Sequence, residues 1–174
     1  MRVITAPEFY IPQEHDITVF LAGGITNCPD WQSKVIKDLN VDNRYLESLV
    51  IFNPRRENFP IWDKSAAYAQ IEWEYQMLEK CDVFSMYFSS GDSDQPICMY
   101  ELGRNILRMQ MRFPSDWQDR IVISVENDYI RRQDVLVQTE LATQNQIFVN
   151  TQISPRVCLA DHVDNIVMAF ENLR

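Results

Sequence analysis

The sequence predicts a doubly wound α/β fold built on a mainly parallel β-sheet. From residue 17 onward, short apolar runs rich in β-branched and aromatic residues alternate with longer segments of helical character. The apolar runs are nearly continuous, as in Val83–Phe88, which is typical of strands covered by helices on both faces. The chain has 174 residues and shows no internal repeat, so we expect one domain over 1–174, with 1–16 as a lead-in segment.

The strands are placed by β-rich runs that end at turn residues. The run at 17–22 stops at Gly23 and Gly24, and the run at 49–52 stops at Asn53 and Pro54. We expect about five strands in the core of the sheet. The candidate strands are 2–5, 17–22, 49–52, 83–88, 120–125 and the short segment 147–149.

The helices are placed by apolar periodicity and by residues that favour helix starts. Pro29 and Pro96 suit first helical turns, and Ser65 suits an N-cap. In the helix that Ser65 begins, Ile71, Tyr75 and Leu78 lie on one face, which we take as its apolar face. The expected helices are 29–39, 65–80, 96–112, 133–142 and 161–173.

Composition and charge exclude several classes of protein. A net charge of −9 opposes binding to a nucleic acid polymer, although a few local arginines can still serve a small anion. The four cysteines form no CxxC pair and the chain has two histidines, so we expect neither a bound metal nor another cofactor. No apolar run approaches the ~18 residues of a membrane span and the N-terminus does not resemble a signal peptide, which predicts a cytoplasmic protein.

In a doubly wound fold, ligands bind outside the carboxyl ends of the strands. The loops to consider are therefore 22–30, 53–63, 89–96 and 126–134. The first carries two of only four glycines, which are expected where a side chain does not fit, and it either approaches a ligand or forms a tight turn. The second is rich in aromatic and arginine side chains, which suit a planar base or an anion, or simply pin a solvated loop.

Two glutamates next to these loops are candidates for chemistry. Glu74 lies one turn after Gln70 on the helix at 65–80, and it is either an exposed acid or a carboxylate on a partly apolar face. Glu101 lies in the first two turns of the helix at 96–112, where it either is partly dehydrated or forms a surface pair with Arg104 or Asn105. We interpret Asp92 and Asp94 as solvated turn residues rather than ligands of a divalent ion.

Taken together, these segments resemble the nucleoside 2-deoxyribosyltransferase family, and more closely its deoxyribosyltransferase-like branch. The resemblance spans about residues 1 to 170 and rests mainly on four stretches in order, with 129–135 as a weaker match. The four stretches are VFLAGGI with CPDWQ (19–32), NPRR with NFPI (53–61), QIEWE (70–74) and PICMYELG (96–103).

The resemblance implies a flavodoxin-like fold and cleavage of the N-glycosidic bond of 2′-deoxyribonucleosides, with transfer of the sugar to another nucleobase. Glu101 matches the nucleophile, which would form a covalent deoxyribosyl–enzyme intermediate. Glu74 matches an acidic residue that handles the proton of the base, although relatives usually have Asp there. The residues that would line the substrate pocket are Gly23, Gly24, Asn53, Arg55 and Gln95.

This chain departs from the pattern of its relatives in the base pocket. Gln95 occupies the place of an acid about six residues before the nucleophile, and Phe20 replaces a tyrosine for which Tyr100 is a candidate substitute. Relatives complete the site from a second subunit, which makes a homodimer or larger homo-oligomer expected, with Asp134 as the contributed residue. Two alternatives remain open: a hydrolase of deoxynucleoside 5′-monophosphates, with Arg55 or the glycine loop on the phosphate, and a nucleotide-binding module without turnover.

Overall fold

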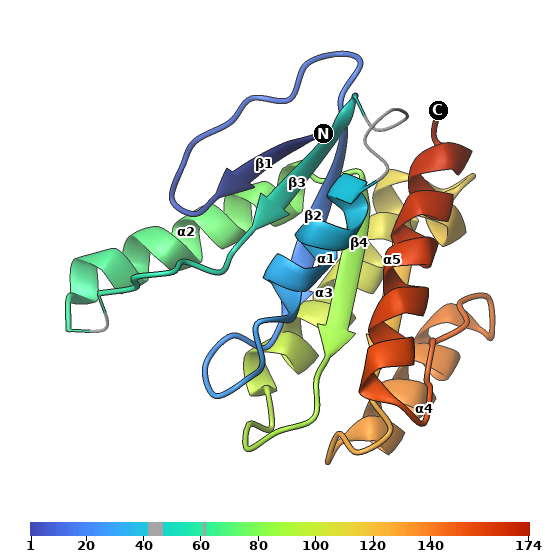
Figure 1. Cartoon of the computed structure of the whole chain (residues 1–174). Coiled ribbons are helices and arrows are strands. Elements are labelled where there is room, and N and C mark those ends of the chain that lie inside the picture. The colour runs from blue at the N-terminus through green and yellow to red at the C-terminus, as the bar shows by residue number, and fades with distance from the viewer. Residues whose placement is uncertain (42–46, 61) are drawn as a thin grey trace.

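The sheet has five parallel strands in the order β1-β3-β2-β4-β5 (Figure 1). A computed structural model describes residues 1–41, 47–60 and 62–174 of the chain. The strands are β1 (Arg2–Thr5), β2 (Ile17–Gly23), β3 (Leu49–Asn53), β4 (Val83–Phe88) and β5 (Ile121–Val125). The predicted parallel sheet is confirmed, and the lead-in segment adds β1 beside β3 as an edge strand.

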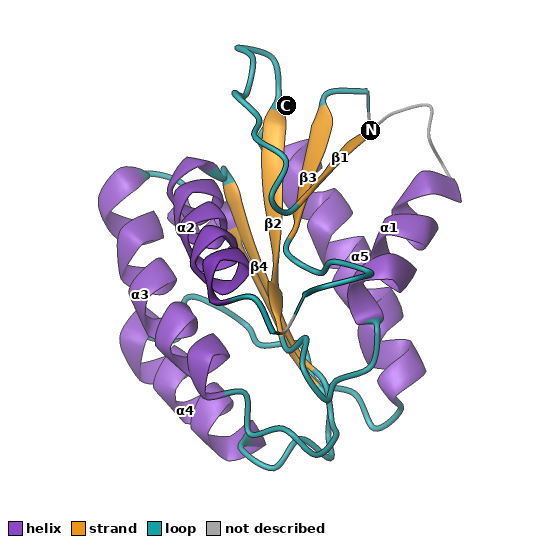
Figure 2. Ribbon diagram, turned by 90° about the vertical axis from the view of Figure 1, so that its left-hand side faces the viewer, coloured by secondary structure: helices purple, strands orange, loops and turns teal. Residues whose placement is uncertain are grey.

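Helices cover both faces of the sheet, as predicted (Figure 2). Residues of α1 (Trp31–Val41) and α5 (Pro155–Asn172) form one hydrophobic cluster with one face. Residues of α2 (Lys64–Lys80) and α3 (Pro96–Arg112) form a second cluster with the other face, and α4 (Arg132–Thr143) packs beside α3. A short 3-10 helix, Trp117–Arg120, precedes β5. The arrangement is an open, doubly wound sheet of the flavodoxin-like type.

Several predicted boundaries are wrong at the ends of elements. The expected strand at 147–149 is not formed, because the segment meets the sheet edge only through one bridge between Asn150 and Ser124. The last helix begins at Pro155 rather than residue 161, since proline suits the first helical turn. The N-cap of α2 is Asp63, whose carboxylate accepts from the backbone N–H of Ser65 at 2.8 Å. Helix α1 starts two residues after Pro29, at Trp31.

The expected apolar face of α2 is also wrong in part. Of the three residues predicted to share it, Leu78 is buried, but Ile71 and Tyr75 are 66% and 57% exposed. The face that packs on the sheet instead centres on Trp73 and Met77. Helical periodicity reveals that a helix has apolar stripes, but it does not say which stripe faces the sheet when there are two.

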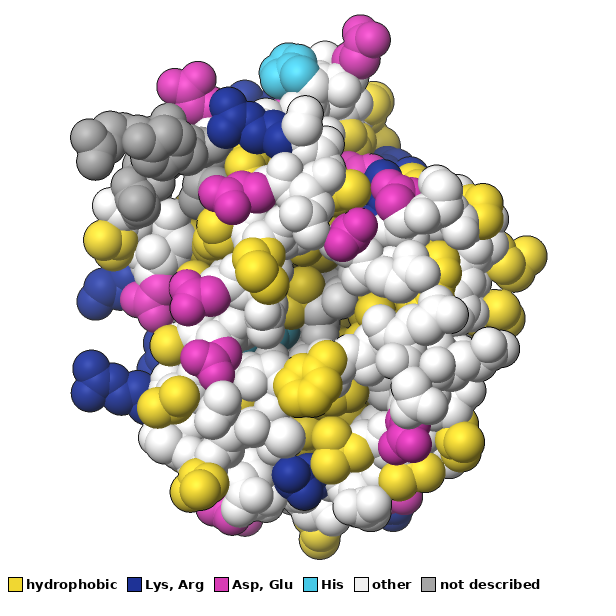
Figure 3. Space-filling model, turned by 90° about the vertical axis from the view of Figure 1, so that its right-hand side faces the viewer, with side chains coloured by type: hydrophobic (Ala, Val, Ile, Leu, Met, Phe, Trp, Pro, Cys, Tyr) yellow, Lys and Arg dark blue, Asp and Glu magenta, His cyan; other side chains and the backbone are white. Residues whose placement is uncertain are grey.

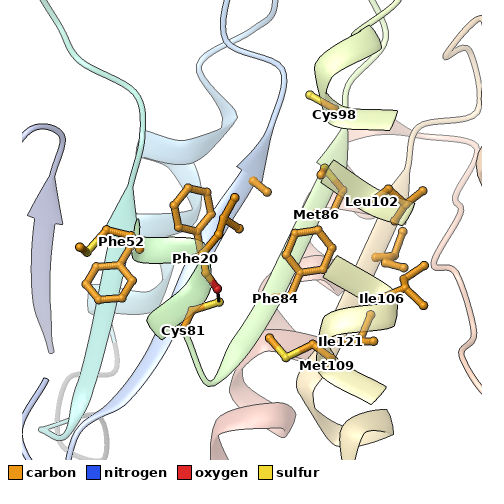
Figure 4. Packing of buried hydrophobic residues seen from close by; sticks show 14 of the residues in the cluster. Phe20, Phe52, Cys81, Phe84, Met86, Cys98, Leu102, Ile106, Met109 and Ile121 are labelled. Carbon is orange, nitrogen blue, oxygen red and sulfur yellow. Dashed lines mark hydrogen bonds between the residues drawn. The ribbon is translucent and has the colours of Figure 1, made fainter. Parts of the chain in front are cut away.

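The packing of α3 against the sheet determines where its first turns lie. Figure 4 shows Leu102 and Ile106 of α3 beside Met86 and Phe84 of β4, in a cluster that Phe20 of β2 extends. Burying each such side chain contributes about 1.5–3 kcal/mol relative to leaving it in water. The start of α3, and therefore Glu101 in its second turn, is held firmly above the carboxyl ends of β2 and β4.

No helix in ranges 1–41, 47–60 and 62–174 is long and apolar enough to cross a bilayer. On the face that carries α4 and α5, hydrophobic side chains are interspersed with charged and other polar ones (Figure 3).

Candidate active site

A cavity of about 240 Å³ opens at the carboxyl ends of β2 and β4. These two strands are neighbours in the sheet, and the chain leaves them in opposite directions, to β3 on one side and to β5 on the other. This is the switch point at which doubly wound folds bind ligands. The lining residues are Phe20, Ala22, Gly23, Gly24, Ile25, Thr26, Pro54, Glu74, Ser93, Gln95, Pro96, Ile97, Cys98 and Glu101.

Neither Gly23, the last residue of β2, nor Gly24 after it has room for a side chain. Gly23 has a φ of +148°, which side-chain-bearing residues rarely adopt, and a Cβ there would lie 2.3 Å from the carbonyl oxygen of Tyr87. A Cβ on Gly24 would lie 2.4 Å from Cys28 Sγ and 2.6 Å from Gln95 Oε1. The expectation that glycines stand where side chains do not fit is therefore confirmed for this loop, but not for Gly103, where a Cβ meets nothing within 4 Å.

Gln95 lines the cavity, but its amide is bound to backbone groups. Its Oε1 accepts from the N–H of Gly24 at 3.1 Å, and its Nε2 donates to the carbonyl oxygen of Ser89 at 2.7 Å. The residue is 3% exposed and adopts the left-handed conformation just before α3. Gln95 thus ties the loop after β2 to the loop after β4, and its amide is engaged before any ligand arrives.

The loop after β4 is also held by hydrogen bonds to two residues at the end of β5 and in the loop that follows it, for which sequence reasoning gave no such role. The carboxylate of Glu126, 6% exposed at the end of β5, accepts from Tyr87 Oη at 2.7 Å and from the N–H of Ser90 at 2.7 Å. The hydroxyl of Tyr129 donates to the carbonyl oxygen of Asp94 at 2.7 Å. The only sequence signal was an acid directly after a buried strand, in a loop already expected at this edge.

Glu74 reaches the cavity from the side of α2. Gln70, one turn earlier, donates from Nε2 to Glu74 Oε1 at 2.8 Å and to the carbonyl oxygen of Pro54 at 2.7 Å. The predicted proximity of Gln70 and Glu74 is confirmed. Burial raises the pKa of Glu74, and the hydrogen bond from Gln70 opposes part of that effect.

Glu101 reaches the same cavity from α3. Burial is the main cause that raises its pKa from 4.5 to about 7; the nearby Glu74 raises it further, and Arg104 lowers it. The alternative of a surface pair is wrong, because Arg104 forms its ion pair with Glu79 and the side chain of Asn105 donates to the backbone oxygen of Glu101.

The cavity therefore contains two partly dehydrated carboxyl groups that repel each other when both are ionised. Burial raises the pKa of both groups, and Glu74 raises that of Glu101 further, so both hold a proton at higher pH than a free glutamate does. One ionised carboxylate and one carboxylic acid on the same cavity form the pair of groups that glycosidic bond cleavage uses.

Asn53 and Arg55 lie beside the cavity rather than on its lining. Asn53 Oδ1 accepts from the N–H of Arg55 at 3.0 Å and shapes the turn after β3. The guanidinium of Arg55 donates to Gln32 Oε1 at 2.8 Å and to the carbonyl oxygen of Pro29 at 2.9 Å, and it lies 3.3 Å from Asp30 Oδ1. It also reaches the carbonyl oxygens of residues 24, 25 and 28. Arg55 thus supports the glycine loop from behind.

Three other residues considered from the sequence lie away from the cavity in this chain. Asp134 is on the first turn of α4, paired with Arg131 at 3.2 Å, in a separate groove between α3 and α4. Tyr100, the candidate substitute for the tyrosine of relatives, is 68% exposed and does not line the cavity. Trp62, an aromatic residue of the loop at 53–63, is 88% exposed, and Ile61 of the NFPI stretch lies outside the described residues.

Within the described ranges, no three or more His, Cys, Asp or Glu side chains come together in a group that could hold a metal ion. The four cysteines are free thiols. Among the described residues, no lysine or arginine lines the cavity, so its charged groups are the two glutamates.

The fold and the cavity define a flavodoxin-like α/β protein with a paired-carboxylate pocket at its switch point. A family model described as nucleoside 2-deoxyribosyltransferase like matches residues 16–113, which is more than half of the chain. The chain therefore belongs to the nucleoside 2-deoxyribosyltransferase-like family, as its sequence motifs predicted. The matched range contains every residue of the cavity lining and ends before Asp134. No curated protein matches the chain.

Proposed function

We propose that this protein cleaves the N-glycosidic bond of 2′-deoxyribonucleosides and transfers the deoxyribosyl group to another nucleobase. The observation that carries the proposal is the convergence of Glu74 and Glu101 on one cavity at the switch point, in a chain of this family. Among the described residues, neither carboxyl group forms an ion pair with a cation, which leaves both available for chemistry.

In the proposed reaction, Glu101 is the nucleophile in its ionised form, which requires the proton that it holds with a pKa of about 7 to pass to Glu74 first. Its carboxylate oxygen bonds to C1′ of the sugar as the bond between C1′ and the base nitrogen breaks, and the electron pair of that bond leaves with the base. Protonated Glu74 donates a proton to the departing base and becomes ionised. An incoming base then attacks C1′, releases Glu101 as a carboxylate and returns a proton to Glu74.

The surroundings of the cavity favour an uncharged nucleoside over a 5′-monophosphate. A phosphate would enter a cavity whose charged groups are two acids, without a lysine or arginine among the described lining residues. Arg55, the candidate for phosphate binding, is engaged with Gln32 and with backbone carbonyl groups. Gly24 likewise has its N–H bound to Gln95.

The remaining parts of the proposal concern partners and location. We infer that the substrates are a nucleoside and a free nucleobase, that no metal or other cofactor takes part, and that the active species is a cytoplasmic homo-oligomer. In one copy of the chain, Asp134 is separated from the cavity, so its proposed role requires a second subunit.

Base exchange with a panel of deoxynucleosides and free adenine tests the proposal. We expect exchange with the wild-type protein and a loss of at least about 10³-fold in Glu101→Ala, since removing a nucleophile typically costs this much or more. The matched control is Glu72→Ala, an exposed glutamate on α2, which should keep wild-type activity. Full turnover by a folded Glu101→Ala protein would exclude the mechanism.

The same assay without an acceptor base separates transfer from hydrolysis. A transferase releases little free base until adenine is added, whereas a hydrolase releases it at the same rate with or without adenine. Binding of a deoxynucleoside to both wild type and Glu101→Ala, without turnover in either, would support the binding-module alternative.

A further inference from the structure

Glu126, the first residue after β5, is a buried carboxyl group held by neutral donors. It is 6% exposed, and no ion pair among the described residues includes it. Tyr87 Oη donates to its Oε1, while the N–H and the hydroxyl of Ser90 both donate to its Oε2. A carboxylate accepts hydrogen bonds without donating any, which fits three donors. Because burying a carboxylate is costly unless it is well hydrogen-bonded, these contacts point to a specific role.

One set of contacts runs from Glu126 into the loop after β4. The carboxylate fixes the N–H of Ser90 at 2.7 Å and also its hydroxyl. In the same loop, Gln95 Nε2 donates to the carbonyl oxygen of Ser89 at 2.7 Å, and Gln95 Oε1 accepts from the N–H of Gly24 at 3.1 Å. Because Ser89 precedes Ser90 in the chain, holding Ser90 also holds the carbonyl group that binds Gln95. This first route ends at the N–H of Gly24.

A second set of contacts runs from Glu126 through two buried aromatic side chains. Tyr87 Oη donates to the carboxylate at 2.7 Å, and the ring of Tyr87 packs on that of Trp31 with their centroids 5.1 Å apart. Trp31 Nε1 in turn donates to the carbonyl oxygen of Gly24 at 3.2 Å. Both aromatic residues are buried in a close-packed layer, so a shift of one ring displaces the other. This second route ends at the C=O of Gly24.

The two routes meet at Gly24, which lines the candidate active site. Glu126 itself is not among the described residues that line the cavity. The loops after β2 and β4 lie at the same carboxyl edge of the sheet, at its lower end in Figure 1. The loop after β4 continues directly into α3, which carries Glu101. One carboxylate behind the cavity is thus shared by the two loops that frame it.

We propose that Glu126 is a positioning residue of this active site. Its carboxylate holds the loops after β2 and β4 in a fixed relation, and it thereby sets how a bound nucleoside lies against Glu101. The effect on Glu101 rests on the proposed function, whereas the position of the loops does not. Glu126 lies outside residues 16–113, the range that the family model matches.

The expected consequence of losing this contact falls on turnover rather than on binding. Attack on C1′ requires the reacting atoms to lie about 3–3.5 Å apart, and a misplacement of about 1 Å can lower the rate about 10²-fold. Binding of the substrate is spread over the whole cavity lining, so it tolerates a small shift of one loop.

Steady-state kinetics of Glu126→Gln test the effect on turnover. This variant keeps the size of the side chain but replaces one acceptor oxygen by an NH2 group that faces a donor. We expect kcat for base exchange to fall about 10- to 100-fold, with KM for the deoxynucleoside within about threefold of wild type.

The matched control is Asp82→Asn, at the opposite edge of the sheet. Asp82 also accepts from the N–H and the hydroxyl of a single residue, Thr18, at 2.9 and 2.8 Å. Thr18 is the second residue of β2, at the end away from the cavity. Asp82→Asn therefore loses a comparable structural contact, but its kcat per folded protein should stay within about twofold of wild type.

Two resonances in an amide proton–nitrogen correlation spectrum report the position of the loops without any reaction. They are the indole N–H of Trp31 and the backbone N–H of Gly24, and the chain has only four tryptophans and four glycines to resolve. Both should shift in Glu126→Gln and stay in place in Asp82→Asn, because only Glu126 is connected to Gly24. Tyr87→Phe and Ser90→Ala each remove one hydroxyl donor, and they should shift the Trp31 and Gly24 resonances respectively.

Shifted resonances together with a reduced kcat in Glu126→Gln would support the proposal. Unmoved resonances in a folded Glu126→Gln protein, or an equal loss of kcat in Asp82→Asn, would overturn it, and shifted resonances with an unchanged kcat would exclude a role in turnover. If Glu126→Gln does not fold, Tyr87→Phe and Ser90→Ala carry the test, and unchanged resonances and kcat in both would overturn the proposal. A wild type without base exchange would refute the proposed function, while the resonances would still decide whether Glu126 holds the loops.

Discussion

Replacing Glu101 by glutamine should stabilise the protein, and the gain should grow with pH. In the folded state the pKa of Glu101 is about 7, against 4.5 for the free side chain, mainly because the group is buried. The folded protein therefore binds this proton more tightly than the unfolded chain does. The stability that results is fully present below about pH 4.5 and is lost as the pH rises to about 7.

The size of the effect follows from the same two values. At 1.36 kcal/mol for each pKa unit, the difference between 4.5 and about 7 corresponds to roughly 3 kcal/mol of destabilisation when Glu101 ionises. Because the side chain is not fully buried, we expect about 2–3 kcal/mol in practice. For a chain of this length, that is a rise in Tm of roughly 5–10 °C for Glu101→Gln at pH 8.

Thermal unfolding of wild type and Glu101→Gln, followed by circular dichroism from pH 4.5 to 8, measures the effect. The two melting temperatures should coincide near pH 4.5, where wild-type Glu101 is protonated and resembles glutamine. Glu72→Gln, at an exposed position on α2, is the matched control and should show no pH-dependent difference. An equal difference at both ends of the range, or a less stable Glu101→Gln at pH 8, would refute the dehydration of Glu101.

Three further predictions concern the loops, the oligomer and metal dependence. Gly24→Ala should cost about 1–3 kcal/mol in urea unfolding because its Cβ would lie 2.4 Å from Cys28 Sγ. Gly103→Ala, where a Cβ meets nothing, should gain up to about 1 kcal/mol; equal losses in both would contradict the crowding at Gly24. If Asp134 completes the pocket of a neighbour, mixing inactive Glu101→Ala with inactive Asp134→Ala should restore part of the activity, whereas verified subunit exchange without recovery would exclude a shared site. Activity should survive EDTA, because no three metal-ligand side chains come together in the described part of the chain. A loss of activity in EDTA that a divalent ion restores would disprove this.

Much of the fold and part of the site could be predicted from local patterns. Continuous apolar runs such as Val83–Phe88 identify strands buried on both faces, and such strands pair in parallel. Because the carboxyl ends of parallel strands share one edge of the sheet, the glycine loop after β2 and the start of α3 had to meet there. The proximity of Gly24 to Gln95 follows from that geometry.

Other features depend on contacts between distant parts of the chain. The segment 147–149 has the composition of a strand, but it touches the sheet only through the single bridge at Asn150. The direction of Arg55 depends on carbonyl groups that the glycine loop presents 26 to 31 residues earlier in the sequence. Local propensity contains no information about either contact.

The sequence by itself determined the strands, the loops at their carboxyl ends and the two acids that the helices bring to that edge. Only the tertiary structure decided which face of each helix is buried, and with it the environment of those acids. Ile71 and Trp73 are both apolar residues of α2, yet the sheet covers Trp73 and leaves Ile71 exposed. The same choice of face turns Glu74 towards Glu101, and the resulting dehydration raises the pKa of both. Periodicity records that a helix has apolar sides, whereas burial depends on which side finds a partner.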